Sequence, residues 1–390
     1  MIKVLNIIGA RPQIIKSAAI SRVIRNSFSD SIEEEILHTG QHYDNKMSEV
    51  FFTEMEIPPP KYNLNVGSDS HGRQTAKMII GIEEILMESR PDYVIIYGDT
   101  NSTLAASVSA SKLQIPIVHI EAGMRSFNKS MPEEINRIVC DHVSTLLFSP
   151  TKTGITNLKN EGFSLSSKMP FDMDNPGVYH CGDIMYDNAM YFKNSLQKNY
   201  ELVPGLNLKE EDFILMTLHR PANTDYTDRM NSIFSAINRL SLSYKTHIIL
   251  PLHPRTVNIL DESIENQLMK QIHKNEFIHI IDPASYLEMI YLESNASMVI
   301  TDSGGVQKEA YYFKKPCIIL RAETEWTELV ELKAAILVDA NEQEIYSAYK
   351  YFSSSNSIQD TDLFGDGKAA EYICTLLVEN YKAINANNSY

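Results

Sequence analysis

The sequence predicts an α/β fold built from two doubly wound parallel sheets in tandem. Short β-rich runs alternate with helical patterns along the whole chain, which is typical of parallel sheets covered by helices. The run at 93–97 is apolar throughout, as expected for a strand that is buried on both faces. The chain has 390 residues, which is too long for one ordinary core and suits two domains.

The first half of the chain supplies one complete series of strands and helices. Apolar and β-branched runs predict strands at 3–8, 35–39, 92–97, 116–120 and 144–148. Helical spacing between them predicts helices at about 12–26, 45–55, 72–89, 101–113, 132–142 and 151–161.

Residues 164–177 interrupt this alternation, because they are rich in Ser, Pro, Asp and Asn and favour an irregular linker. We therefore expect a first domain over 1–177 and a second over 178–365, with a last amphipathic helix within 366–390. The second domain should open on a short strand at 178–181 and a helix near 183–194. Its further strands are expected at 213–218, 246–250, 277–281, 297–301, 316–320 and 335–338.

The amino-acid composition excludes some classes of binding partner and indicates the cellular compartment. The net charge is −15, so general affinity for nucleic acid or an anionic membrane is not expected, because such partners need broad positive surface. The four cysteines form no C-x-x-C pair and favour reduced core thiols over disulfides or zinc. No signal-peptide pattern opens the chain and no apolar run reaches 18 residues, so we expect a cytoplasmic protein.

The first strand-to-helix turn has the composition of a phosphate site. Gly9 permits a sharp turn, Pro12 suits the first helical position, and Arg11 and Lys16 add two cations near a helix N-terminus with free N–H groups. The alternative is a tight turn with two solvated cations. The turn lacks G-x-G-x-x-G and the P-loop pattern, which disfavours NAD binding and P-loop nucleotide hydrolysis.

Carboxylates end two neighbouring strands of the first series. Asp99 follows the strand at 92–97 and Glu121 follows the strand at 116–120, so both should lie at the carboxyl edge of the sheet, where ligands bind. A carboxylate there can act as general acid or base, although Asp99 could instead cap the next helix. Glu133 opens a helix, where it could simply complement the helix dipole, and Arg137 could pair with a carboxylate or reach a phosphate.

The second half carries a second set of turns with anion-binding character. His219 ends the strand at 213–218 and His253 ends the next one, each close to an arginine. The segment 301–309 follows an apolar strand and opens a helix with Ser303, Gly304 and Gly305. Such a helix start lets a pyrophosphate approach several backbone N–H groups, and Glu309 could accept from ribose hydroxyls; the alternative is a glycine turn with a solvated glutamate.

Taken together, these turns resemble the non-hydrolysing UDP-N-acetylglucosamine 2-epimerase family from end to end. The matching motifs are GARPQIIK at 9–16, HTGQH at 38–42, YGDTNST at 97–103, HIEAGMRS at 119–126, MPEEINR at 131–137, LHR at 218–220, DP at 282–283 and TDSGGVQKEA at 301–310. They occur in one order at one set of turns, which makes the combination highly specific.

The resemblance implies a GT-B fold of two Rossmann-like domains with an interdomain cleft, a last helix that crosses back onto the first domain, and a homodimer. It implies that the catalytic residues are Asp99, Glu121, Glu133 and His219. It further implies that UDP or the sugar is held by Arg11, Lys16, Arg137, Ser303, Gly304, Gly305, Glu309 and Arg321.

Several positions depart from the commoner family pattern. Ala10 and Gln13 stand where Thr and Glu are usual, and Trp326-Thr327 stand where an Arg-Pro pair is usual. These variants resemble the subgroup that includes epimerases of UDP-2,3-diacetamido-2,3-dideoxyglucuronate, so the sugar stays open between that substrate and UDP-N-acetylglucosamine.

The expected reaction needs neither cofactor nor metal. The C2 proton of the sugar is hardly acidic, because C2 adjoins an acetal carbon. Expulsion of UDP with removal of that proton gives a 2-acetamidoglucal, and re-addition of UDP with protonation from the opposite face gives the epimer, which would feed surface polysaccharide synthesis. The alternatives are a UDP-sugar-dependent GT-B glycosyltransferase, a hydrolysing 2-epimerase and a catalytically inactive UDP-sugar sensor.

A second UDP-sugar site is a further expectation of the resemblance. The residues that match a regulatory site in some bacterial members are Gln41, Arg73 and His253. Asp44 stands where an amide donor is expected, and its charge would repel a second diphosphate within a Debye length, roughly 8 Å at physiological salt. We therefore expect weak or absent activation.

Overall fold

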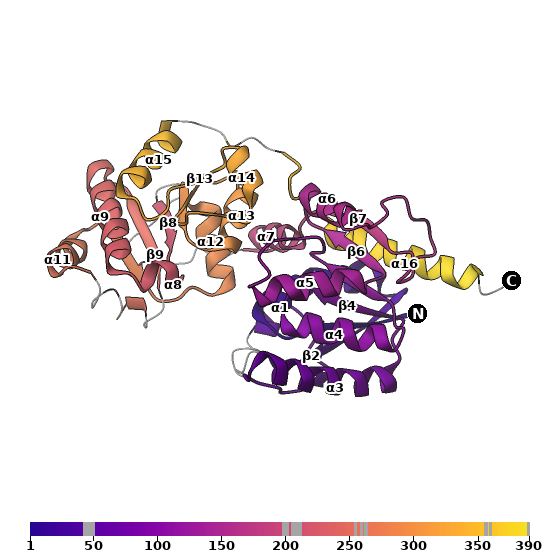
Figure 1. The fold of residues 1–390 in the computed structure, drawn as a ribbon. Helices are drawn as coiled ribbons and strands as arrows, with labels where there is room; N and C mark the ends of the chain where they lie inside the picture. Colours follow the sequence, from indigo (N-terminus) through magenta and orange to yellow (C-terminus); the bar gives the residue numbers. More distant parts are fainter. Residues whose placement is uncertain are drawn as a thin grey trace. The chain divides into compact units, whose positions relative to one another are not determined.

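The structure is a computed structural model that describes residues 1–41, 51–196, 203, 213–252, 256–257, 260, 264–354, 358 and 361–387. The chain forms two compact units (Figure 1): Met1–Asn188 with Asp362–Tyr390, and Ala189–Thr361. Each unit is built on a parallel sheet with helices packed on it, which confirms the predicted α/β class.

The first unit contains a seven-stranded sheet in the order β3-β2-β1-β4-β5-β6-β7. Its strands are β1 (Ile2–Ile8), β2 (Ile32–His38), β3 (Tyr62–Asn63), β4 (Tyr93–Tyr97), β5 (Ile117–Ile120), β6 (Leu146–Ser149) and β7 (Gly177–His180). Its helices are α1 (Arg11–Val23), continued by a π turn at Ile24–Phe28, then α3 (His71–Ser89), α4 (Asn101–Lys112), α5 (Pro132–His142), α6 (Lys152–Asn160), the start of α7 (Ile184–Ser195) and α16 (Ala369–Asn387). Leu5, Val94 and Ile117 stand beside one another in the strand register and are fully buried, which explains why these strands are apolar runs.

The second unit contains a six-stranded sheet in the order β10-β9-β8-β11-β12-β13. Its strands are β8 (Phe213–Thr217), β9 (His247–Pro251), β10 (Ile278–Ile281), β11 (Met298–Thr301), β12 (Cys317–Ile319) and β13 (Ala335–Leu337). The helices are α8 (Pro221–Thr224), α9 (Thr227–Tyr244), α11 (Asn266–Lys274), α12 (Tyr286–Asn295), α13 (Gly304–Tyr312), α14 (Thr327–Glu331) and α15 (Glu342–Ser354).

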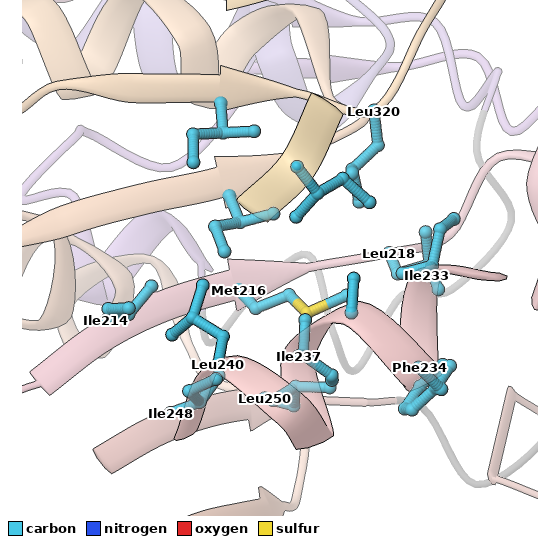
Figure 2. Packing of buried hydrophobic residues seen from close by; sticks show 14 of the residues in the cluster. Ile214, Met216, Leu218, Ile233, Phe234, Ile237, Leu240, Ile248, Leu250 and Leu320 are labelled. Carbon is cyan, nitrogen blue, oxygen red and sulfur yellow. The ribbon is translucent and has the colours of Figure 1, made fainter. Parts of the chain in front are cut away.

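The core of the second unit forms where α9 packs on the sheet. Figure 2 shows Ile237 and Leu240 of α9 packed against side chains of β8 and β9, including Met216 and Ile248, all of them fully buried. Burying one such aliphatic side chain stabilises the fold by roughly 1.5–3 kcal/mol. This packing holds the ends of the strands, and therefore the turns that follow them, in fixed positions.

The expected domain boundary at 178 is wrong in detail. The strand that was expected to open the second domain is β7, and it pairs with β6 of the first sheet, with Gly177 opposite Leu146. The change of unit comes within α7, after Asn188. The irregular segment at 164–177 is therefore an excursion inside the first unit, and the sheet continues beyond it.

The C-terminal helix α16 belongs to the first unit. The side chain of Asn380 donates to Tyr93 Oη at 3.0 Å and accepts from the backbone N–H of Phe171 at 2.7 Å. The carboxylate of Asp187 accepts from the N–H groups of Ala369 and Ala370, at 3.1 and 2.8 Å, and so caps the first turn of α16. Within the described residues, no helix is both long and apolar enough to cross a membrane.

Most of the helix expected at 45–55 lies outside the described residues. The part that is described, from Phe51 onward, begins helical. The two-residue edge strand β3 was not expected, because two residues carry no periodic signal.

Candidate functional site

Each sheet reverses its strand order at one place, and the predicted site residues follow the strands there. In the first unit the reversal lies between β1 and β4, whose turns carry Gly9 and Asp99; in the second it lies between β8 and β11, whose turns carry His219 and Ser303. Crevices outside the carboxyl ends of strands at such reversals are the usual ligand sites of open α/β sheets. The strand order therefore indicates, as ligand sites, the same turns that the sequence motifs indicated.

Lys16 of α1 and Glu121, directly after β5, form an ion pair beside the turn that follows β4. Glu121 has φ of +73°, a left-handed conformation that is strained for a residue with a side chain and is enriched at functional sites. Gly98 is needed next to this pair, because a Cβ there would lie 3.1 Å from Glu121 Oε2 and 3.3 Å from Lys16 Nζ. The strain and the close packing hold both charged groups at the sheet edge.

Asp99 lies between two carboxylates and two cations. Burial raises the pKa of Asp99, and the charges of Glu121 and Glu133 act in the same direction. The charges of Arg137, with which Asp99 forms an ion pair, and of Lys16 act against this increase. The net increase makes Asp99 able to exchange a proton closer to neutral pH than an ordinary aspartate.

The two glutamates that open α5 have different environments. Glu133 is exposed, and its charge acts on Asp99. Glu134 is buried and accepts from the N–H of Ser126, the hydroxyl of Ser126 and the N–H of Phe127, at 2.8, 3.0 and 2.9 Å. Burial would raise the pKa of Glu134, but these hydrogen bonds outweigh it and lower that pKa. Glu134 therefore anchors the preceding loop, and Glu133 is the carboxylate left at the surface.

The turn after β1 is tied to the turn after β4 by Gln13. Its side-chain oxygen accepts from the N–H groups of Gly9 and Ala10 at 2.9 and 3.1 Å, and its amide nitrogen donates to Tyr97 O and Thr103 Oγ1 at 3.0 and 2.9 Å. An amide at this position satisfies two donors and two acceptors at once, which gives the departure at position 13 a physical reason.

Arg11 opens α1 and is exposed, as a binding side chain requires. Its guanidinium stacks over the ring of Phe51, with 4.4 Å from its central carbon to the ring centroid.

A buried charge network that the sequence did not reveal lies beneath the carboxylates. His119 and Asp141 are fully buried, and the ring of His119 is hydrogen-bonded to Asp141 at 2.8 Å and to the carbonyl of Gly98 at 2.9 Å. Arg125 also pairs with Asp141, at 2.7 Å. Burial would raise the pKa of Asp141, but His119 and Arg125 outweigh it and hold that pKa below its usual range. The network fixes the carbonyl immediately before Asp99.

In the second unit, Asp302 fixes the position of His219 in a similar way. Asp302 is fully buried, and it accepts from the N–H groups of His219 and Arg220 and from the side chain of Asn223, at 3.0 to 3.2 Å. The imidazole Nδ1 of His219 lies 3.3 Å from Asp302 Oδ1, whereas the side chain as a whole is 59% exposed. Asp302 thereby orients the imidazole ring of His219. The one sequence signal for this role is that Asp302 comes directly before Ser303 in the motif.

The N-terminus of α13 has the form expected of an anion site. Ser303 caps the helix by accepting from the N–H of Val306 at 3.5 Å, and a Cβ at Gly305 would meet nothing nearer than Ser303 Oγ at 3.9 Å. At Gly304 a Cβ would lie 2.5 Å from a carboxylate oxygen of Glu325, which pairs with Arg321 at 2.7 Å. The structure thus brings Ser303, both glycines and Arg321 together, with a carboxylate already at the positive end of the helix.

The residues expected at a second site are placed only in part. Gln41 Oε1 accepts from the N–H and hydroxyl of Ser102, at 3.1 and 2.6 Å, so its carbonyl end is used to hold the start of α4. Arg73 is exposed in the first turn of α3. His253 and Asp44 lie outside the described residues. Among the residues that the structure describes, no group of three or more His, Cys, Asp and Glu is arranged to hold a metal ion.

The fold and its charged turns define a class: an α/β enzyme of the GT-B type with carboxylate and cationic side chains at its sheet edges. The chain belongs to the UDP-N-acetylglucosamine 2-epimerase family, whose model matches residues 26–378. This confirms the family that the motifs indicated.

Individual relatives cover almost the whole chain. It is 45% identical over 376 residues to the UDP-N-acetylglucosamine 2-epimerase homolog of Methanococcus maripaludis, covering 96% of this chain and 99% of that protein. It is 42% identical over 377 residues to the UDP-2,3-diacetamido-2,3-dideoxy-D-glucuronate 2-epimerase of Pseudomonas aeruginosa, covering 97% and 99%. The crystal structure of the Methanocaldococcus jannaschii UDP-GlcNAc 2-epimerase in complex with UDP-GlcNAc and UDP is 40% identical, with a TM-score of 0.79 and coverage of 97% and 100%. These similarities confirm the subgroup and the GT-B type of fold.

Proposed function

We propose that this protein catalyses the reversible C2 epimerisation of a UDP-linked 2-acetamido sugar, interconverting UDP-N-acetylglucosamine and UDP-N-acetylmannosamine. The observation that carries the proposal is the cluster of Asp99, Glu121 and Lys16 at the sheet reversal of the first unit, in a chain of this family. Proton transfer on both faces of one carbon requires more than one acid–base group, and Asp99 has a second carboxylate and a cation beside it.

The chemistry proceeds by loss and return of UDP. One carboxyl group takes the C2 proton while the C1–O bond to UDP breaks, and the electron pair of the C–H bond becomes the C1–C2 double bond of a 2-acetamidoglucal. UDP then adds back to C1 from its original face, and C2 receives a proton on the opposite face. Asp99, Glu121 and Glu133 are the proposed acid and base groups, and Lys16 offsets the charge of Glu121.

The departing UDP is an anion and needs groups that stabilise its developing charge. The start of α13 supplies backbone N–H groups at Ser303, Gly304 and Gly305, together with the guanidinium of Arg321. His219, oriented by Asp302, is the proposed fourth catalytic residue. In the first unit, Arg11 and Arg137 are the proposed cations toward UDP or the sugar.

The sugar is the open part of this proposal. Relatives that are 45% and 42% identical are named for UDP-N-acetylglucosamine and for UDP-2,3-diacetamido-2,3-dideoxy-D-glucuronate. The second substrate would add a carboxylate at C5 and an acetamido group at C3, and would undergo the same chemistry. We propose UDP-N-acetylglucosamine first, in a homodimeric cytoplasmic enzyme without cofactor or metal, whose product feeds surface polysaccharide synthesis. The support for these last points is the family resemblance.

Product analysis by ³¹P and ¹H NMR tests the proposal. Each purified UDP-sugar is incubated with the enzyme, and the expected product is its C2 epimer with the diphosphate still attached. Free N-acetylmannosamine with UDP would indicate a hydrolysing enzyme. An unchanged UDP-sugar in both incubations would contradict the proposed reaction.

A further inference from the structure

A carboxylate of the chain itself lies at the start of α13, where the diphosphate is proposed to bind. A Cβ placed on Gly304 would lie 2.5 Å from Glu325 Oε1. A C–C bond is about 1.5 Å long, so this oxygen lies within about 4 Å of the Gly304 Cα. Gly304 is the first residue of α13, and the N–H groups of a first helical turn attract anions. Glu325 therefore lies where the helix favours a negative charge.

Two guanidinium groups accompany the carboxylate of Glu325. Arg321 Nη1 donates a hydrogen bond of 2.7 Å to Glu325 Oε2, and Arg220 Nη2 lies 3.9 Å from Glu325 Oε1. Arg321 comes two residues after β12 and Arg220 three residues after β8, so the two cations belong to separate turns at the carboxyl edge of the second sheet. Two guanidinium groups beside a helix start are a combination that also suits a phosphate group.

The backbone of Glu325 is fixed next to α13 by the residues on either side of it. Thr324 donates its hydroxyl to Oε1 of Gln307, a buried residue of α13, at 2.6 Å and accepts from the N–H of Trp326 at 3.1 Å. The side chain of Trp326 is itself buried. The side chain of Glu325, in contrast, is 38% exposed. Its carboxylate therefore has room to leave the arginines while the main chain keeps its place.

A diphosphate at the start of α13 and the carboxylate of Glu325 would compete for the same groups. Both are anions, and both are stabilised by the helix N-terminus and by the guanidinium of Arg321. Two negative charges about 4 Å apart also repel each other. Binding of the nucleotide therefore requires that Glu325 moves away from this position.

We propose that Glu325 is an internal counterion of the nucleotide site: its carboxylate pairs with Arg220 and Arg321 at the start of α13 and gives up this place to the diphosphate, which then binds both arginines. This inference rests on the proposed function, because it requires that UDP binds at α13. It adds Arg220 to the groups that bind the diphosphate. It also favours release of the nucleotide, since the carboxylate returns to the arginines when the diphosphate leaves.

Calorimetry of UDP binding measures the competition. Glu325→Gln keeps the size of the side chain and removes its charge, so UDP should bind about fivefold more tightly, as expected when a modest ion pair and a helix-dipole interaction no longer have to be broken. Glu323→Gln removes the same charge from an exposed position two residues away. It is the matched control and should change the affinity less than about twofold.

The proposed role of Arg220 has its own variant. Arg220→Ala should weaken UDP binding about tenfold, as expected for the loss of one charged hydrogen-bond donor to a phosphate. Its side chain is 39% exposed, so the unfolding temperature should stay close to that of the wild type. The same holds for Glu325→Gln, because an exposed ion pair contributes little to stability.

Salt and a ligand without phosphate separate competition from a merely structural effect. In the wild type the diphosphate replaces one anion on the arginines, whereas in Glu325→Gln it forms new ion pairs. The affinity of Glu325→Gln should therefore fall more steeply between about 0.05 and 0.5 M salt. Uridine carries no phosphate, and the wild type and Glu325→Gln should bind it equally. A structural effect would change the affinity for both ligands alike.

Four results would overturn the proposal. They are equal or weaker UDP binding by Glu325→Gln, an equal gain with uridine, an equal gain in Glu323→Gln, and wild-type UDP affinity in Arg220→Ala. Failure of the wild type to bind UDP at all would contradict the proposed function instead, and it is visible without any variant.

Discussion

The guanidinium of Arg137, on α5, pairs with the carboxylate of Asp99 at the end of β4. Burial raises the pKa of Asp99, and Arg137 is the strongest influence that lowers it. Arg137→Ala should therefore raise the pKa of Asp99 further, whereas Arg137→Lys, which keeps a cation, should change it less. Carboxyl ¹³C NMR titration measures the shift, with Asp99→Asn identifying the signal. An unchanged titration midpoint in Arg137→Ala would mean that the ion pair does not control Asp99.

The three proposed acid–base carboxylates should be separable from their structural neighbour. Asp99→Asn, Glu121→Gln and Glu133→Gln should each lower kcat by about two or more decades, as expected for lost general acid–base catalysis, while UDP affinity is retained. Glu134→Gln is the matched control for Glu133→Gln: it should lower the unfolding temperature, because Glu134 is buried and accepts three hydrogen bonds. Glu133 is exposed, so its variant should unfold as the wild type does. Near-normal turnover in any of the three would remove that residue from the catalytic set.

The fold could be predicted from the sequence where a signal recurs along the chain. All six strands of the second sheet were expected within a residue or two, because each is a short apolar run between turn residues. The two-residue β3 has no such run, and pairing with Leu37 and His38 alone makes it a strand. The domain boundary was misplaced because an irregular segment in the sequence does not reveal whether the next strand joins the old sheet or a new one.

The buried network around Asp141 should make stability depend on pH in the acid range. The folded-state pKa of Asp141 lies below its ordinary value, so its contribution to stability is fully present above the unfolded-state pKa and is lost as pH falls through the folded-state pKa. Asp141→Asn should cost about 3 to 5 kcal/mol at neutral pH, since it removes the buried carboxylate that His119 and Arg125 share and leaves Arg125 with Glu161 alone. Urea unfolding from pH 7 to pH 3 measures both effects. Asp69→Asn, in an exposed pair with Lys77, is the control and should change the stability curve little. An Asp141→Asn protein with the wild-type acid dependence would show that this carboxylate does not govern it.

The sequence indicated candidate site residues only where a reactive side chain lies close to the end of a strand. Asp99, Glu121 and Ser303 could be identified as candidates because each lies within two residues of the end of a buried strand. Asp141 lies in the last turn of α5, where an aspartate is normally solvated, and only the packing of the helix shows that it is buried. Asp302 was missed because its neighbours in the motif have the more familiar roles.

The glycines at the start of α13 allow a clean test of the anion site. In Gly305→Ala the added methyl group meets nothing nearer than 3.9 Å, so the unfolding temperature should not fall. UDP affinity should nevertheless drop about tenfold, because the diphosphate must approach the backbone N–H groups closely. Gly72→Ala, where a Cβ meets nothing within 4 Å, serves as the control, with unchanged affinity by calorimetry. Wild-type affinity in Gly305→Ala would place the diphosphate elsewhere.

The most direct test of the central claim is ¹H NMR of UDP-N-acetylglucosamine with the enzyme in D2O, without added NAD or metal. Elimination and re-addition pass through a glycal that has lost the C2 hydrogen, and that carbon is reprotonated from a group in exchange with solvent. The account predicts that UDP-N-acetylmannosamine appears and that deuterium enters C2 of both epimers. Epimers that keep their original C2 hydrogen, or conversion that strictly requires NAD, would contradict it.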